Sequence, residues 1–367
     1  MKILLIGEYS NVHATLAEGL RAIGHEVTVV SNGDFWKNYP RDIDVSRPTG
    51  KLGGLRLMAK LCALLPRLRG YDVVQLINPM FFELKAERMF FFYNYLRKHN
   101  KKVFLSAFGM DYYWVHECME RKPLRYSDFN FGNELRTDEA AITEQRDWLG
   151  TTKERLNKTI AEDCDGIITG LYEYQVCYEP NVPDKTRFIP FPIKMPESNR
   201  VEEPHDKVNL FIGISKKRSA YKGTDIMLKA AEAIAERYPQ QVVLQVANGI
   251  PFAQYERMLN ASDVILDQLY SYTPAMNALL AMSKGMIVVG GGEPENYEIL
   301  GEEELRPIVN VAPNYDSVFH ELEQLVLKPE RIAELKRQSV EYVRRHHDYI
   351  KVAKEYEAFY NEKSQKA

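Results

Sequence analysis

The chain has 367 residues, which is too long for one compact core and indicates about two domains. Apolar residues make up 45% of it and charged residues 27%, a balance that excludes an intrinsically disordered chain. The net charge of −3 gives no support for nucleic-acid binding. The four cysteines lack the short paired spacing of a zinc ribbon or a disulfide scaffold, which fits a reducing compartment.

The N-terminus and the apolar runs predict where the protein works. Only four apolar residues follow Met1-Lys2, too few for a signal peptide. No apolar run approaches the roughly 18 residues that span a bilayer. We therefore expect a soluble, cytoplasmic protein.

The first half alternates short apolar runs with amphipathic segments. Strands are predicted at residues 3–6, 27–30, 73–77, 103–105, 167–168 and 188–189. Between the first two, apolar residues at helical spacing predict a helix that Asn11 caps and Gly24 ends. Strands that alternate with helices are typical of an α/β fold with a parallel sheet covered on both faces.

The second half repeats this pattern after residues 190–206, a charged stretch with four prolines that we interpret as the linker. Further strands are predicted at 210–214, 242–246, 264–266 and 287–289. The predicted organisation is a doubly wound domain over 1–195, a second over 196–345, and a C-terminal helix over 346–367 that packs back on the first domain. The cleft between two such domains is the expected ligand site.

The turn after the first strand, Gly7-Glu8-Tyr9-Ser10-Asn11, lacks the G-x-G-x-x-G spacing that brings a pyrophosphate close to the backbone. A dehydrogenase is therefore disfavoured. His13 would lie in the first turn of the following helix, beside the expected cleft, which makes it a candidate ligand contact. The alternative for His13 is a solvent-facing histidine.

Residues 213–225, GISKKRSAYKGTD, leave a strand and open a helix. Free N–H groups at a helix N-terminus favour an anion, and Arg218 and Lys222 add positive charge, so this segment predicts a phosphate site. Thr224 is the expected N-cap. A solvated basic loop is the alternative.

The next two strands end in polar residues and glycines. Asp267-Gln268 follows one strand, and Gly290-Gly291-Gly292 ends the other. Glycine lets a backbone come close to a ligand, so these residues predict a nucleotide pocket.

Several motifs stand in an order that resembles the GT-B glycosyltransferases, most closely the retaining family 4. In the second half they are Lys222-Gly223-Thr224, Ala261-Ser262-Asp263, Ala281-Met282-x-x-Gly285 and Gly291-Gly292-x-Pro294-Glu295. In the first half they are Gly24-His25-Glu26-Val27 and Phe108-Gly109-Met110-Asp111. The resemblance implies two Rossmann-like domains facing a central cleft, with a nucleoside-diphosphate sugar on the second and an acceptor on the first.

The reaction implied is transfer of the sugar, with retention, to a hydroxyl of a glycan or lipid-linked acceptor in cell-surface polysaccharide synthesis. We assign catalysis to Arg218, Lys222 and Asp111, the two cations neutralising the leaving diphosphate. The expected donor contacts are Gly213, Thr224, Asp267, Gln268, Tyr272, Gly291, Gly292 and Glu295. On the first domain, we assign Tyr9, Ser10 and His13 to acceptor binding. We expect no metal and no cofactor besides the donor, and we reject Asp163-Cys164-Asp165 as a metal motif because it precedes its strand.

This chain also departs from the family pattern. Tyr272 and Leu280 replace two glutamates, and Phe108 replaces a histidine. Two alternatives therefore stay open: a GT-B partner subunit without catalysis, and a nucleotide-sugar epimerase of related fold.

Residues 47–69 form a basic amphipathic segment without an acidic residue. Leucines are interleaved with six cations: Arg47, Lys51, Arg56, Lys60, Arg67 and Arg69. Such a segment can lie on an anionic bilayer, so we predict peripheral contact with the inner face of a membrane. An ordinary helix packed on the sheet is the alternative.

Overall fold

The computed structural model describes residues 1–197, 207–214, 219–250 and 252–362. The chain divides into two compact units. Unit 1 comprises Met1–Pro123, Thr143–Pro192 and Tyr349–Ala367, and unit 2 comprises Leu124–Ile142 and Ile193–Asp348. The sequence pattern predicts a single domain over 1–195, whereas residues 124–142 pack with unit 2.

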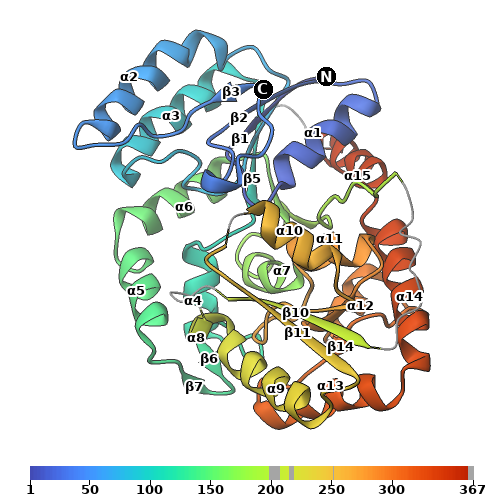
Figure 1. Ribbon diagram of the computed structural model, residues 1–367. Helices are drawn as coiled ribbons and strands as arrows, with labels where there is room; N and C mark the ends of the chain where they lie inside the picture. Colours follow the sequence, from blue (N-terminus) through green and yellow to red (C-terminus); the bar gives the residue numbers. More distant parts are fainter. Residues whose placement is uncertain (198–206, 215–218, 251, 363–367) are drawn as a thin grey trace. The chain divides into compact units, whose positions relative to one another are not determined.

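Unit 1 is built on a seven-stranded parallel sheet in the order β3-β2-β1-β4-β5-β8-β9 (Figure 1). The strands are β1 (Lys2–Ile6), β2 (Glu26–Ser31), β3 (Ile43–Asp44), β4 (Val73–Leu76), β5 (Lys102–Ala107), β8 (Gly166–Thr169) and β9 (Thr186–Phe188). The strand order reverses between β1 and β4. This switch point, at the carboxyl ends of both strands, is where ligands of doubly wound folds bind.

Helices lie between these strands along the chain, and the last of them follows unit 2 in the sequence. They are α1 (Val12–Ala22), α2 (Gly53–Leu64), α3 (Ala86–His99), α4 (Tyr112–Glu120), α6 (Thr152–Asp163), α7 (Tyr172–Tyr178) and α15 (Tyr349–Glu362), with 3-10 turns η1 (Phe35–Lys37) and η2 (Leu65–Arg67). α5 (Glu139–Trp148) spans the point where the chain returns to unit 1. α15 lies beside α1, and a Cβ on Gly19 would come within 2.3 Å of the Tyr349 carbonyl oxygen, so this contact requires glycine (Figure 1).

Unit 2 is built on a five-stranded parallel sheet in the order β11-β10-β12-β13-β14. Its strands are β10 (Val208–Ile214), β11 (Val242–Asn248), β12 (Val264–Leu266), β13 (Ile287–Gly290) and β14 (Val309–Asn310). Residues 124–142, the inserted segment, add the hairpin of β6 (Asn130–Phe131) and β7 (Glu134–Leu135). Its helices are α8 (Ser219–Lys222), α9 (Thr224–Arg237), α10 (Phe252–Asn260), α11 (Met276–Ser283), α12 (Pro294–Leu300), α13 (Tyr315–Leu327) and α14 (Glu330–His346).

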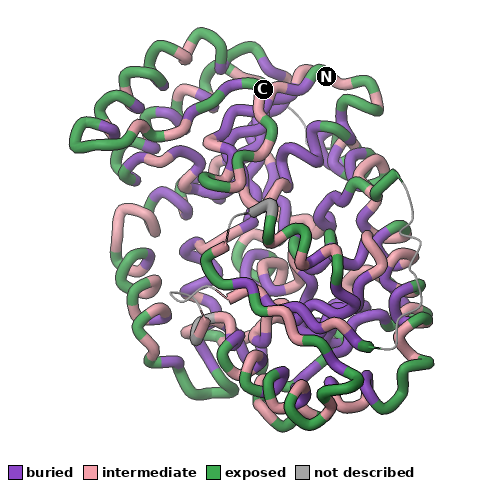
Figure 2. The backbone as a smooth tube through the Cα atoms, in the orientation of Figure 1, coloured by how far each residue is buried: buried purple, intermediate pink, exposed green. Residues whose placement is uncertain are grey.

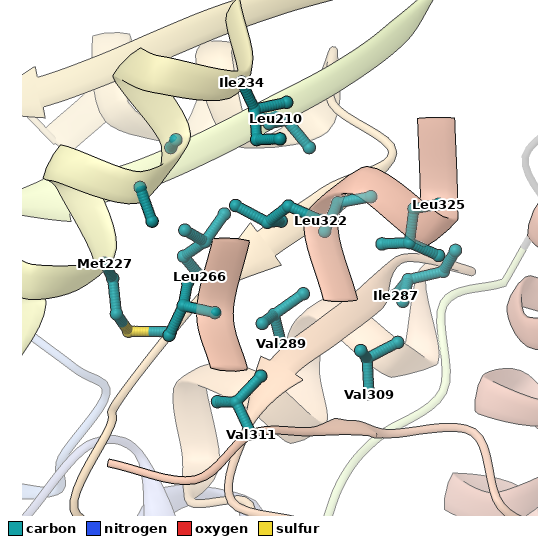
Figure 3. Packing of buried hydrophobic residues seen from close by; sticks show 14 of the residues in the cluster. Leu210, Met227, Ile234, Leu266, Ile287, Val289, Val309, Val311, Leu322 and Leu325 are labelled. Carbon is teal, nitrogen blue, oxygen red and sulfur yellow. The ribbon is translucent and has the colours of Figure 1, made fainter. Parts of the chain in front are cut away.

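The core of unit 2 fills the space between its sheet and the helices α9 and α13 (Figure 3). Leu210, Leu266 and Val289 of the strands meet Met227 of α9 and Leu322 of α13 in this cluster. Figure 2 colours the chain by burial: buried residues lie on the inner strands, and exposed residues lie on the outer faces of the helices. The core therefore fixes the strand ends where the candidate site lies.

The structure confirms the predicted α/β class, and a strand overlaps each of the ten sequence ranges expected to form one. The overlap at 188–189 is Phe188 alone, because β9 begins at Thr186 and ends at Phe188. Among the described residues, no helix is both long enough and apolar enough to span a membrane.

Candidate functional site

Three neighbouring strands of unit 2 bring the predicted donor residues to one edge of the sheet. Gly213 lies near the carboxyl end of β10, and Asp267-Gln268 directly follows β12. Gly291-Gly292 directly follows β13. Because β10, β12 and β13 are adjacent and parallel, these residues gather at their common carboxyl edge.

Glycines let the loops after β12 and β13 pack closely against each other. A Cβ on Gly290 would lie 2.8 Å from the Gln268 carbonyl oxygen, and one on Gly291 would lie 2.5 Å from Ser271 Oγ. The backbone N–H of Gly292 donates to Asn310 Oδ1 at 3.2 Å. These glycines therefore serve packing between loops, while the close approach of a ligand stays a prediction.

The Lys222-Gly223-Thr224 turn differs from its prediction in one respect. Thr224 is not the N-cap of α9 but its first residue, and Gly223 occupies the cap with a left-handed φ of +71°. Glycine is required because α8 turns directly into α9 here, and a Cβ would lie 2.6 Å from Leu269 Cβ. Thr224 is buried, with Oγ1 3.0 Å from Ser219 Oγ.

Lys222 is joined to the β12 loop, since its carbonyl oxygen accepts the Leu269 N–H at 3.0 Å. Arg218, the other predicted cation, lies outside the described residues. Asp267 accepts a hydrogen bond from Asn277 Nδ2 at 3.2 Å, and Tyr255 donates to Asn277 Oδ1 at 3.4 Å. Side chains from α10 and α11 thus orient the carboxylate that follows β12.

Tyr272 and Glu295 meet an arginine that the sequence analysis did not single out. Arg125, in the inserted segment, donates its backbone N–H to the buried Tyr272 hydroxyl at 2.7 Å. Its guanidinium donates to Glu295 Oε2 at 3.1 Å and to Glu293 Oε2 at 2.7 Å. Burial raises the pKa of Glu295, but hydrogen bonds from Arg125 and the backbone outweigh it and hold that pKa below its usual value.

In unit 1, the predicted acceptor residues surround the carboxyl end of β1. His13 is fully buried, with Nδ1 2.9 Å from the Gly7 carbonyl oxygen and Nε2 3.2 Å from Gln75 Nε2. Burial lowers its pKa to about 3. His13 is therefore neither solvent-facing nor available to an acceptor, because both ring nitrogens already have partners within the protein.

Tyr9 and Ser10 are half-buried in the turn that precedes α1. Ser10 donates its N–H to Asp34 Oδ2 at 2.9 Å, and its Oγ accepts from Lys37 Nζ at 3.2 Å. Their assignment to an acceptor stays a prediction.

Asp111 is fully buried at the N-cap of α4. It accepts the Trp114 N–H at 2.9 Å and the Tyr178 hydroxyl at 2.7 Å, and burial raises its pKa to about 7. This geometry gives Asp111 a structural role as a helix cap, and it offers no support for the catalytic role implied by the resemblance. At the amino ends of β5 and β8, Arg97 pairs with both Asp163 and Asp165, the two carboxylates of the rejected metal motif.

Comparisons with known proteins place this fold. No family model and no curated protein matches the chain. Sucrose-phosphate synthase from Thermosynechococcus elongatus is similar over 99% of both chains, with 14% identity and a TM-score of 0.62. HepE from Anabaena, in complex with UDP-glucose, is similar over 99% of this chain and 100% of its own, with 11% identity and a TM-score of 0.61.

A third similar structure is a putative UDP-N-acetylglucosamine 2-epimerase from Listeria monocytogenes, covering 100% of this chain and 98% of its own at 11% identity and a TM-score of 0.55. The chain has the GT-B fold. This confirms the predicted fold class. At these identities the likeness concerns the fold alone, and the specific relation to family 4 stays a prediction.

Proposed function

We propose that the protein is a glycosyltransferase, related to the retaining family 4, that binds a nucleoside-diphosphate sugar at the carboxyl edge of the unit 2 sheet. The observation that carries the proposal is the convergence of Gly213, Asp267-Gln268 and Gly291-Gly292 at that edge from three separate stretches of sequence. The fold is shared with HepE, whose structure was determined with UDP-glucose.

The chemistry assigned to this edge is neutralisation of the leaving diphosphate. Lys222, which ends α8 beside the β12 loop, and Arg218 supply positive charge where negative charge develops as the glycosidic bond breaks. Glu295 accepts hydrogen bonds from a hydroxyl of the ribose or the sugar. The acceptor is a hydroxyl of a glycan or of a lipid-linked glycan in cell-surface polysaccharide synthesis, and the reaction uses neither a metal nor a further cofactor.

A thermal-shift screen with UDP, UDP-glucose and UDP-N-acetylglucosamine tests the donor site. A ligand at a hundred times its dissociation constant should stabilise the protein by about 2.7 kcal/mol. Release of UDP that requires an added acceptor would then identify a transferase. The absence of both a shift and turnover with every sugar nucleotide would contradict the proposal.

An epimerase is the second candidate, favoured by the structural likeness to the Listeria protein. An epimerase acts on the sugar nucleotide alone, so conversion of UDP-N-acetylglucosamine without an acceptor would favour it. Binding of a sugar nucleotide without any turnover would favour the partner subunit that has lost catalysis.

We further propose that α2 contacts an anionic membrane at the cytoplasmic face. α2 buries Gly53, Leu57 and Leu61, while Leu52 and Leu55 beside them are 58% and 62% exposed. The six cations of residues 47–69 are all exposed. An exposed apolar stripe flanked by cations matches the chemistry of an anionic lipid surface.

Vesicle sedimentation tests this contact. Each cation near an anionic surface contributes about 1 kcal/mol, so Arg56→Glu, Lys60→Glu and Arg67→Glu together should abolish binding to phosphatidylserine-containing vesicles. Added salt should weaken wild-type binding. Equal binding by the triple variant, or no binding by the wild type, would count against the membrane contact.

A further inference from the structure

The segment Leu124–Ile142 leaves the unit 1 sequence after α4 and packs as part of unit 2. We propose that this segment forms one wall of the donor site and that Arg125 is a positioning residue, which orients the Glu295 carboxylate toward the sugar nucleotide. The inference rests on the proposed function, because it concerns the same edge of the unit 2 sheet.

The backbone of Arg125 is fixed on both sides. Its N–H donates to the Tyr272 hydroxyl at 2.7 Å, and its carbonyl oxygen accepts the Gly132 N–H at 2.6 Å. The buried Asn130 amide donates to the carbonyl oxygens of Leu124 and Gly132, both at 2.9 Å. The guanidinium therefore starts from a rigid support, as a positioning residue requires.

The β6–β7 hairpin anchors the segment to the loop after β12. Arg136 is 7% exposed, and its guanidinium lies 4.5 Å from the centre of the Tyr270 ring and 5.2 Å from that of Phe131. The Phe131 and Tyr270 rings are in edge contact at 5.1 Å, and Asp138 pairs with Arg136 Nε at 2.9 Å. A buried cation held between two rings stabilises this attachment. The segment thus covers the residues that directly follow the proposed donor contacts Asp267 and Gln268.

Arg125 joins two carboxylates that stand at the start of α12. Its guanidinium bonds to both oxygens of Glu295 and to Oε2 of Glu293, whose other oxygen accepts the Tyr126 hydroxyl. Glu293 is thereby occupied on both oxygens. The planar fork of an arginine fixes the direction of a carboxylate that it binds through two parallel bonds.

Glu295 keeps the capacity to bind a ligand while it is held. A carboxylate offers about four acceptor positions, and Arg125 uses two of them. The side chain of Glu295 is 19% exposed and that of Arg125 is 56% exposed, so the pair borders open space rather than the core. A ribose or sugar hydroxyl can therefore donate to Glu295 without displacing Arg125.

Titration calorimetry with UDP-glucose tests the inference on Arg125→Gln, Glu295→Gln and the double variant. If Arg125 acts through Glu295, each single variant should weaken UDP-glucose binding about tenfold, and the double variant should bind no more weakly than the weaker single one. Arg125→Lys should restore part of the affinity, since lysine keeps the charge but not the fork. The matched control is Arg337→Gln, which removes an exposed ion pair on α14 and should bind like the wild type.

The pH dependence of binding separates positioning from a merely structural role. Removing the Arg125 cation should raise the pKa of Glu295, so the acid limb of the binding profile should move to higher pH in Arg125→Gln. If Glu295→Gln weakens binding while Arg125→Gln does not, or if the two losses multiply in the double variant, the inference is overturned and the proposed donor site stands. If Glu295→Gln binds like the wild type, the inference is overturned and Glu295 leaves the donor site.

Discussion

Asp111 shows how burial decides what a single side chain can do. Phe108-Gly109-Met110-Asp111 could be matched to a family pattern by residue type, but sequence does not reveal whether a carboxylate faces a ligand or caps a helix. Here it caps α4 and is closed off from solvent. The same holds for His13. Its position beside the β1 turn was predictable, but its hydrogen-bonded burial was not, because Gln75 is 62 residues away in sequence and lies on β4, which neighbours β1 in the sheet.

The raised pKa of Asp111 makes a prediction about stability. Its folded pKa of about 7 lies above the ordinary value of 3.8, so between those values the folded state holds a proton that the unfolded state releases. Wild-type stability therefore falls as pH rises through that window. Asp111→Asn keeps the capping oxygen and has no such titration.

Urea unfolding at pH 4.5 and pH 8 measures this effect. The free energy of unfolding of Asp111→Asn relative to the wild type should increase by about 3 kcal/mol from the lower to the higher pH. A difference that does not change with pH would show that Asp111 has the same pKa in the folded and the unfolded state.

At the scale of elements, the number of residues in a strand decided whether the sequence could predict it. The apolar runs of the longer strands were predictable because a buried strand needs them. β3, β14 and the β6–β7 hairpin have two residues per strand, too few for a recognisable pattern. No local pattern could indicate Arg125 either, because its partners Tyr272 and Glu295 lie 147 and 170 residues away in the sequence.

The Ala261-Ser262-Asp263 motif connects a strand and a helix at the amino end of the unit 2 sheet, away from the donor edge. Asp263 precedes β12 and accepts the Asn209 N–H at 2.8 Å and Lys336 Nζ of α14 at 2.5 Å. The side chains of Asp263 and Lys336 are 4% and 10% exposed. This buried pair ties α14 to the amino end of the unit 2 sheet.

Removing the cation of that pair should destabilise unit 2. Lys336→Met leaves the buried Asp263 carboxylate without this partner and should cost about 3–5 kcal/mol, while adding Asp263→Asn should recover much of the loss. Urea unfolding followed by far-ultraviolet circular dichroism measures both. A loss below about 1 kcal/mol in Lys336→Met would mean that the pair does not stabilise α14 on the sheet.

At the scale of the whole molecule, each compact unit draws on distant parts of the chain. Unit 1 is completed by α15, where Tyr360 donates to Gln75 and its ring lies 4.9 Å from that of Phe104. Lys102 Nζ donates to the Tyr360 carbonyl oxygen at 2.6 Å. The last helix is therefore part of the first unit's core.

Tryptophan fluorescence follows the unfolding of unit 1, because all three tryptophans, Trp36, Trp114 and Trp148, lie within it. Tyr360→Ala removes a fully buried aromatic ring and should lower the free energy of unfolding by about 3–5 kcal/mol. Tryptophan fluorescence in a urea titration should report this loss. An unchanged transition would exclude α15 from the core of unit 1.

The central claim is that unit 2 binds the diphosphate of a sugar nucleotide where Lys222 meets the β12 loop, and UDP affinity by titration calorimetry tests it most directly. The comparison needs the wild type, Lys222→Ala and the control Lys229→Ala, an exposed lysine farther along in α9. We predict that the wild type and Lys229→Ala bind UDP equally and that Lys222→Ala binds at least about tenfold more weakly, because a charge-assisted contact to phosphate is lost. Equal UDP binding by Lys222→Ala, or no binding by the wild type, would contradict the account.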